Sequence, residues 1–109
     1  MFKIVQDRTF IRTITVMTPS GNDFAKETLK VTYNYLSTEE TKGFDLKSVD
    51  GSTAFLRRVV ASLDDLSDAD GNPLTFNEAV RDVVLAMPNA RHAITEGYFI
   101  AINKAAEGN

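Results

Sequence analysis

Alternate acidic side chains in Asp68-Ala69-Asp70-Gly71-Asn72 are of the type that binds Ca²⁺ in helix–loop–helix calcium sites. Such a loop needs Gly at its sixth position and a bidentate Glu at its twelfth. This chain has Pro73 and Ala79 at those positions. The segment is therefore predicted to be a turn that ends a helix, because Gly, Asn and Pro all favour non-helical backbone.

Other residues capable of chemistry are also better explained by structure. His92 is the only histidine, and Glu96 follows four residues later, so the two are interpreted as a surface pair on one helix. The adjacent carboxylates Glu39-Glu40 and Asp64-Asp65 would diverge by about 100° on a helix and could not act on one substrate atom. No Ser, Lys or Tyr stands beside a base that would activate it. We predict no catalytic residue, no metal site and no cofactor, and a protein that is not an enzyme.

Composition indicates a single globular domain. The chain has 109 residues, of which 43% are hydrophobic and 25% charged. A net charge of −3 argues against nucleic-acid binding, which depends on Lys and Arg. No run of about 18 apolar residues occurs, so no membrane span is expected. The chain contains no cysteine, which excludes disulfides and fits a cytoplasmic protein.

The first third of the chain has the alternation of β-strands. Short strands are predicted over 2–5 and 10–17, and a clearly alternating strand over 27–35. The polar segment 18–23 is predicted to be a turn, so the simplest topology is an antiparallel hairpin. This small sheet would need helices or another subunit on its apolar face.

Helical patterns follow from residue 37 onward. Ser37 begins a capping box for a short helix that ends near residues 43–47. Ser52 is the expected N-cap of a central helix that runs to Leu66. Its apolar stripe has spacings of three and four and consists of Phe55, Leu56, Val59, Val60, Leu63 and Leu66.

Two more helices are predicted after the acidic turn. Thr75 and Glu78 form a second capping box, with a helix from Phe76 that Pro88 ends. The last helix, over 89–106, is apolar around much of its circumference, which is typical of a central helix or of an interface. The predicted fold class is α+β, with a small N-terminal antiparallel hairpin or sheet followed by a bundle of three to four helices. It is a single domain over 1–109, β-rich over 1–36 and helical over 37–106.

The predicted core and the predicted contact surface use different residues. We expect the core to contain Phe55, Leu56, Val59, Val60, Val83, Ile94 and Tyr98. The candidate self-association or partner surface consists of the aromatic and aliphatic residues Tyr33, Tyr35, Phe99 and Ile100, together with the basic pair Arg57 and Arg58.

Four segments, in order, are similar to tail assembly chaperones of long-tailed (siphovirus-type) bacteriophages over about residues 29–106. They are Tyr35-Leu36-Ser37-Thr38-Glu39-Glu40, Phe-Leu-Arg-Arg-Val-Val at 55–60, the acidic Asp-Gly-Asn-Pro-Leu-Thr-Phe turn at 70–76, and the Ala-rich, aromatic segment 90–105. The chain departs from the family at Ser62-Leu63, where many relatives carry Gly-Trp.

The resemblance implies a role in virion morphogenesis in the host bacterial cytoplasm. A chaperone of this family self-associates into rings or spirals, coats the tape measure protein, recruits tail tube protein subunits and is absent from the finished particle. It also implies a longer form made by ribosomal frameshifting, for which the codons of Glu107-Gly108-Asn109 could supply the slippery sequence. The alternative is a structural virion component, such as a connector or tail-completion protein. A DNA-binding regulator is a third reading, which the acidic balance disfavours.

Overall fold

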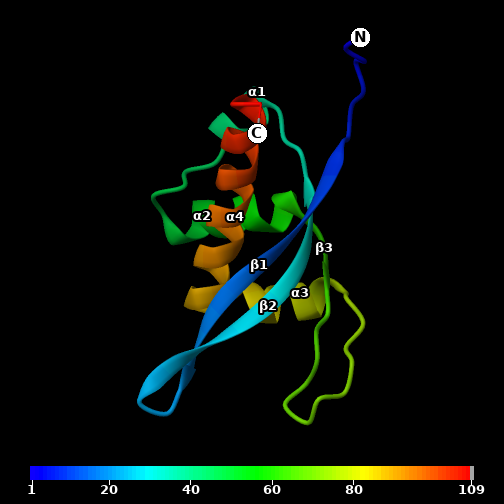
Figure 1. The fold of residues 1–109 in the computed structure, drawn as a ribbon. Helices are drawn as coiled ribbons and strands as arrows, with labels where there is room; N and C mark the ends of the chain where they lie inside the picture. The colour runs from blue at the N-terminus through cyan, green and yellow to red at the C-terminus, as the bar shows by residue number, and fades with distance from the viewer. Residues whose placement is uncertain (109) are drawn as a thin grey trace.

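A three-stranded antiparallel sheet and four helices make up the fold, which the computed structural model describes over residues 1–108 (Figure 1). Along the chain the elements are β1 (Thr9–Ser20), β2 (Asp23–Asn34), α1 (Thr38–Lys42), α2 (Val49–Val59), β3 (Val60–Asp64), α3 (Glu78–Leu85) and α4 (Pro88–Ala106). The predicted α+β class is confirmed. Asn109, the end of the predicted frameshift site, lies outside the described residues.

Strands β1 and β2 form the predicted hairpin, with a longer ladder than expected. Thr9 pairs with Asn34 at one end and Ser20 with Asp23 at the other. The predicted turn over 18–23 is therefore only two residues long. Gly21 has φ +63° at its first position, where a two-residue hairpin turn favours glycine.

All four helices lie on one face of the sheet, and the strands alternate accordingly (Figure 1). In β1, Ile14 and Val16 are buried while Thr13 and Thr15 are exposed. The buried core joins this face of the sheet to α2, α3 and α4, and its residues with at most 2% exposure are Val31, Tyr33, Phe55, Leu56, Val59, Leu63, Leu85, Ile94 and Tyr98. Helices therefore cover the apolar face of the sheet, which had been expected to need cover.

The predicted central helix is wrong in its second half. Helix α2 ends at Val59, and the chain continues as β3, which pairs with β2 in the order β1-β2-β3. Val60 takes extended backbone, and the side-chain amide of Asn34 donates to the Arg58 carbonyl at 2.9 Å. The open edge of β2 offers backbone partners to 60–64. Leu63 remains in the core together with Val60, three residues before it, because a β-bulge opposite Thr32 and Tyr33 shifts the register between them. The division into a β-rich part over 1–36 and a helical part over 37–106 is corrected by this strand.

Two of the predicted helix starts are also wrong. Ser48, and not Ser52, caps α2, because its hydroxyl accepts from the Gly51 N–H at 2.9 Å. Asn77, and not Thr75, caps α3 by accepting from the Val80 N–H at 2.8 Å. The Ser37 cap of α1 and the position of Pro88 in the first turn of α4 are confirmed.

Two further predictions are wrong because of the way these elements pack. Val83 is 60% exposed, since α3 turns Arg81, Val84 and Leu85 toward the rest of the fold. The predicted strand over 2–5 has no partner, and Figure 1 shows this segment leading away from the sheet. The other predicted core residues are buried: Phe55, Leu56, Val59, Val60, Ile94 and Tyr98.

Helix α4 packs across β1 and β2, and Gly97 allows it to come close to the sheet. A Cβ at this position would lie 2.8 Å from both Ile14 Cγ2 and Tyr33 Oη. The Tyr33 hydroxyl donates to the Ile94 carbonyl at 2.7 Å, which anchors the helix to β2. Within residues 1–108, no helix combines the length and the apolar character that a membrane crossing demands.

Candidate functional site

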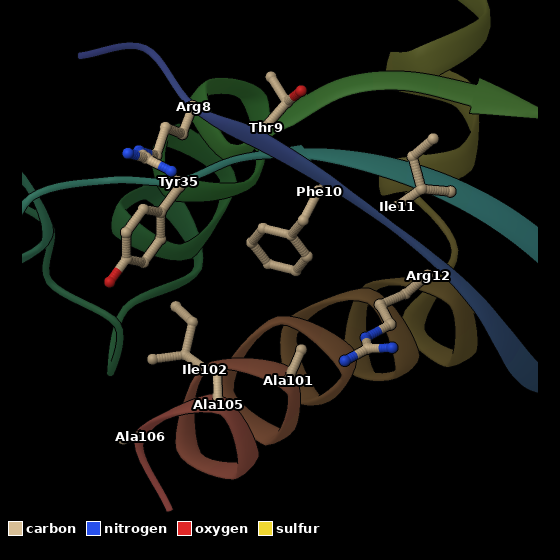
Figure 2. A pocket seen from close by; sticks show the side chains of 10 residues that line it. All are labelled: Arg8, Thr9, Phe10, Ile11, Arg12, Tyr35, Ala101, Ile102, Ala105 and Ala106. Carbon is tan, nitrogen blue, oxygen red and sulfur yellow. The ribbon is translucent and has the colours of Figure 1, made fainter. Parts of the chain in front are cut away.

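An apolar groove opens between β1 and the C-terminal half of α4 (Figure 2). Its volume is about 570 Å³. One wall is Arg8–Arg12, and the other is made by Ala101, Ile102, Ala105 and Ala106, with Tyr35 at the end. Because three of the four helix residues are alanines, this part of α4 does not fill the space above β1. A groove of this kind suits an apolar segment of a partner rather than a reaction.

Phe10 forms the floor of the groove and connects it to the core. Figure 2 shows its ring pointing from β1 toward α4, between Tyr35 and Arg12. The ring stacks on Tyr33 at 5.1 Å between centroids and lies 5.7 Å from Tyr98. Tyr35 meets Phe10 edge-on at 6.4 Å. The groove is therefore lined by side chains that the core holds in place.

Buried tyrosines fix this aromatic cluster with two hydrogen bonds. Tyr33 donates to the Ile94 carbonyl, and the Tyr98 hydroxyl accepts from the Leu36 N–H at 3.1 Å. Burial raises the pKa of Tyr33 well above the usual range, and it also raises the pKa of Tyr98. Both hydroxyls therefore stay protonated under ordinary conditions, and their role is to position α4 against the sheet.

Basic side chains flank the groove. Arg8 donates to the Lys3 carbonyl at 2.8 Å, and the Arg12 guanidinium stands at the rim in Figure 2. Within residues 1–108 neither arginine forms a salt bridge with a carboxylate. The rim is thus suited to a partner that brings negative charge or aromatic rings to it.

The predicted surface residues separate into different environments. Tyr33 is fully buried, so its assignment to a contact surface is wrong: the strand alternation points it at α4. Tyr35 is 53% exposed and lines the groove, whereas Ile100 is exposed outside it. Phe99 is partly buried and stacks on Phe55 at 5.6 Å.

Arg57 and Arg58 are exposed and each joins α2 to another helix. Arg57 pairs with Asp82 of α3 at 3.2 Å, and Arg58 makes a bidentate pair with Glu40 of α1. Arg81 and then Arg57 also hold the pKa of Asp82 below its usual range. Since both guanidiniums are already paired, they are poorer candidates for a partner surface than the arginines of the groove.

The other chemical hypotheses have structural outcomes. The Asp68 carboxylate accepts from the N–H groups of Asp70 and Asn72, both at 2.9 Å, as expected for a turn. His92 and Glu96 form the predicted surface pair at 2.8 Å. In residues 1–108, no group of three or more His, Cys, Asp or Glu is placed to hold a metal ion.

Sequence reasoning missed most of the groove residues. Phe10 and Arg12 were identified only as parts of a predicted strand and Ile102 only as part of the last helix, because their meeting depends on α4 crossing β1. One signal was available: the spacing Ala101-x-x-x-Ala105 shows a stretch of α4 with little side-chain volume.

Comparisons with models of protein families, with curated proteins and with solved structures found no match to this chain.

Proposed function

We propose that this chain is a non-enzymatic tail assembly chaperone of a long-tailed bacteriophage. In this role it self-associates, coats the tape measure protein and recruits tail tube subunits in the host cytoplasm, then leaves before the particle is complete. A longer frameshifted form of the chain would share the same fold. The proposal originates in the four segments that resemble this family, and the geometry adds support.

The observation that supports it most is the apolar surface left uncovered at one end of the molecule. The groove lined by Phe10, Tyr35 and Ile102 lies near the C-terminal end of α4. The N-terminal residues extend from the same end of the molecule (Figures 1 and 2). The exposed residues there include Phe2 and Ile4. Exposed apolar patches of this kind are typical of surfaces that bind other proteins. A protein that holds an aggregation-prone rod in solution requires such a surface.

The structure also brings two of the resembling segments together. Glu40, from the segment at 35–40, pairs with Arg58, from the segment at 55–60, and Tyr35 of the first segment lines the groove. The two segments therefore hold α1 against α2 and supply part of the groove. Segments that act together in one function are expected to meet in the structure in this way.

Co-expression with the tape measure protein encoded beside this chain tests the proposal. We expect the wild-type chain to keep the tape measure protein soluble and to elute with it as a large complex on a sizing column. The variant Tyr35→Asp, which puts a charge in the groove, should lose this effect. Val83→Asp is the matched control, since Val83 is 60% exposed and lies on α3 outside the groove.

Circular dichroism would first establish that both variants fold. An insoluble tape measure protein beside a discrete oligomer of the wild-type chain would contradict the proposal. The presence of this chain in purified particles would then favour the alternative, a connector or tail-completion protein.

A further inference from the structure

The N-terminal arm, defined as Met1–Val5, carries large apolar side chains that the rest of the chain does not cover. Phe2 is 88% and Ile4 is 90% exposed. The backbone turns at Asp7, which has φ +59°, and Figure 1 shows the arm leading away from the helices. The arm lies beside the groove on each molecule, because Arg8 both lines the groove and donates to the Lys3 carbonyl.

The first half of β1 has an unpaired edge beside the groove. β1 is an edge strand of the sheet, paired with β2 on one side only. On that paired side the Tyr35 N–H donates to the Arg8 carbonyl at 2.8 Å. Because antiparallel pairing alternates, the backbone groups of Thr9, Ile11 and Thr13 point outward. An edge of this kind accepts an added strand.

We propose that two copies of the chain exchange arms, each arm adding as an antiparallel strand to β1 of the other copy. Directly opposed residues of antiparallel strands have their side chains on the same face. With Ile4 opposite Phe10 and Phe2 opposite Arg12, both apolar side chains of the arm enter the groove. Lys3 then faces solvent, opposite the exposed Ile11.

The length and the chemistry of the arm fit this register. Five extended residues span about 16 Å, and in this register the arm faces residues 9–13, which include four of the five residues of the wall Arg8–Arg12. Phe2 meets the Arg12 guanidinium, which favours an aromatic ring beneath it. In this register the twofold axis passes between the two copies of Asp7, and Arg8 of each copy lies opposite Gln6 of the other.

Reciprocal exchange closes on itself, so it gives a symmetric dimer. Such a dimer would be the unit from which a ring or spiral is built. The inference rests on the self-association contained in the proposed function, and on no other part of that function.

Sedimentation equilibrium of the full chain tests the exchange first. We expect the wild-type chain to dimerise and Phe2→Ser/Ile4→Ser to raise the dissociation constant by at least about 100-fold, because two buried apolar side chains are lost from each arm. The control Val49→Ser removes an apolar side chain that is 75% exposed on α2 and should leave the constant unchanged. Dissociation constants that are equal for the wild type and the double variant would overturn the exchange.

Disulfide trapping locates the arm, because the natural chain has no cysteine. Ile4→Cys chains are mixed with Ala105→Cys chains, one of them carrying a size tag, and oxidised. We expect the mixed disulfide to form at least about tenfold faster than with Ala25→Cys, an exposed alanine on the hairpin far from the groove. Equal rates for the two alanine positions would overturn the proposed docking site.

The outcomes separate this inference from the proposed function. A wild-type chain that stays monomeric at all concentrations would contradict both the exchange and the self-association. A wild-type oligomer that the arm variants leave unchanged would overturn the exchange alone. Solubility of the tape measure protein in the co-expression assay tests the chaperone function independently of either result.

Discussion

Replacing Gly97 with alanine should destabilise the fold by about 3 kcal/mol, although alanine favours a helix. The added Cβ would lie 2.8 Å from Ile14 Cγ2 and 2.8 Å from Tyr33 Oη, closer than a methyl group can approach either atom. Helix α4 must then move away from the sheet, or these two side chains must shift within a packed core.

Three terms set the size of the effect. Alanine stabilises a helix interior by about 1 kcal/mol relative to glycine. Overpacking a core costs about 1–3 kcal/mol. Displacing the Tyr33 hydroxyl from the Ile94 carbonyl leaves a buried hydroxyl without its partner, which costs about another 1–3 kcal/mol. The two costs together exceed the helical gain.

Urea unfolding followed by circular dichroism measures the change. For a domain of this size a loss of about 3 kcal/mol lowers the melting temperature by more than about 10 °C. A double-mutant cycle with Tyr33→Phe isolates the cause, because removing the hydroxyl removes one of the two clashes. Gly97→Ala should therefore cost clearly less in the Tyr33→Phe background. A variant as stable as the wild type, or equal costs in both backgrounds, would refute the close approach of α4 to β2.

The remaining predictions concern pH and the helix starts. Because burial raises the pKa of Tyr33 and Tyr98, folding favours their neutral forms; the contribution of these two tyrosines to stability should be constant below the ordinary tyrosine pKa of 10.0 and fall as the pH rises above it. Chemical unfolding between pH 8 and about 11 should show this fall, with a smaller slope for Tyr33→Phe. Gly51→Ala should lower the urea midpoint strongly, since its Cβ would lie 2.0 Å from a backbone carbonyl oxygen. Asn77→Ala should cost about 1 kcal/mol in thermal unfolding and Thr75→Ala almost nothing; the reverse order would contradict the observed start of α3.

The hairpin and the last helix could be predicted because their signals are local. Alternation over 27–35 requires only the period of a strand, and Pro88 fixes a helix start through its own ring. Both elements agree with the structure, although the hairpin is longer at its turn end. The predicted buried residues of the central segment are also correct, because apolar side chains are buried in either kind of element.

The division of 55–66 between helix and strand could not be predicted from its pattern. Val59, Val60 and Leu63 fit the spacing of a helix, and a short apolar segment of this kind can equally form a buried strand. What decides between them is the open edge of β2, which is far away in the sequence. The same dependence on distant partners explains Val83, whose exposure follows from how α3 lies against α4.

The candidate site was predicted only in part. Tyr35 was identified as an exposed aromatic residue, but Tyr33 was grouped with it although the helices bury Tyr33, while Tyr35 lies just past the end of β2 and stays half exposed. The groove itself exists because the alanines of α4 cross above Phe10. No local pattern contains that crossing.

By itself, the sequence determined the class of fold, the hairpin pairing, the cap at Ser37, the helix start at Pro88, and most of the core. These features depend on side-chain period, turn chemistry and capping, which act over a few residues. Only the tertiary structure decided that 60–64 is a strand, that Tyr33 is buried, and that Phe10, Tyr35 and α4 enclose a groove. The physical reason is that edge pairing and helix crossing join residues far apart in the chain, and their energies depend on which partner surface is available.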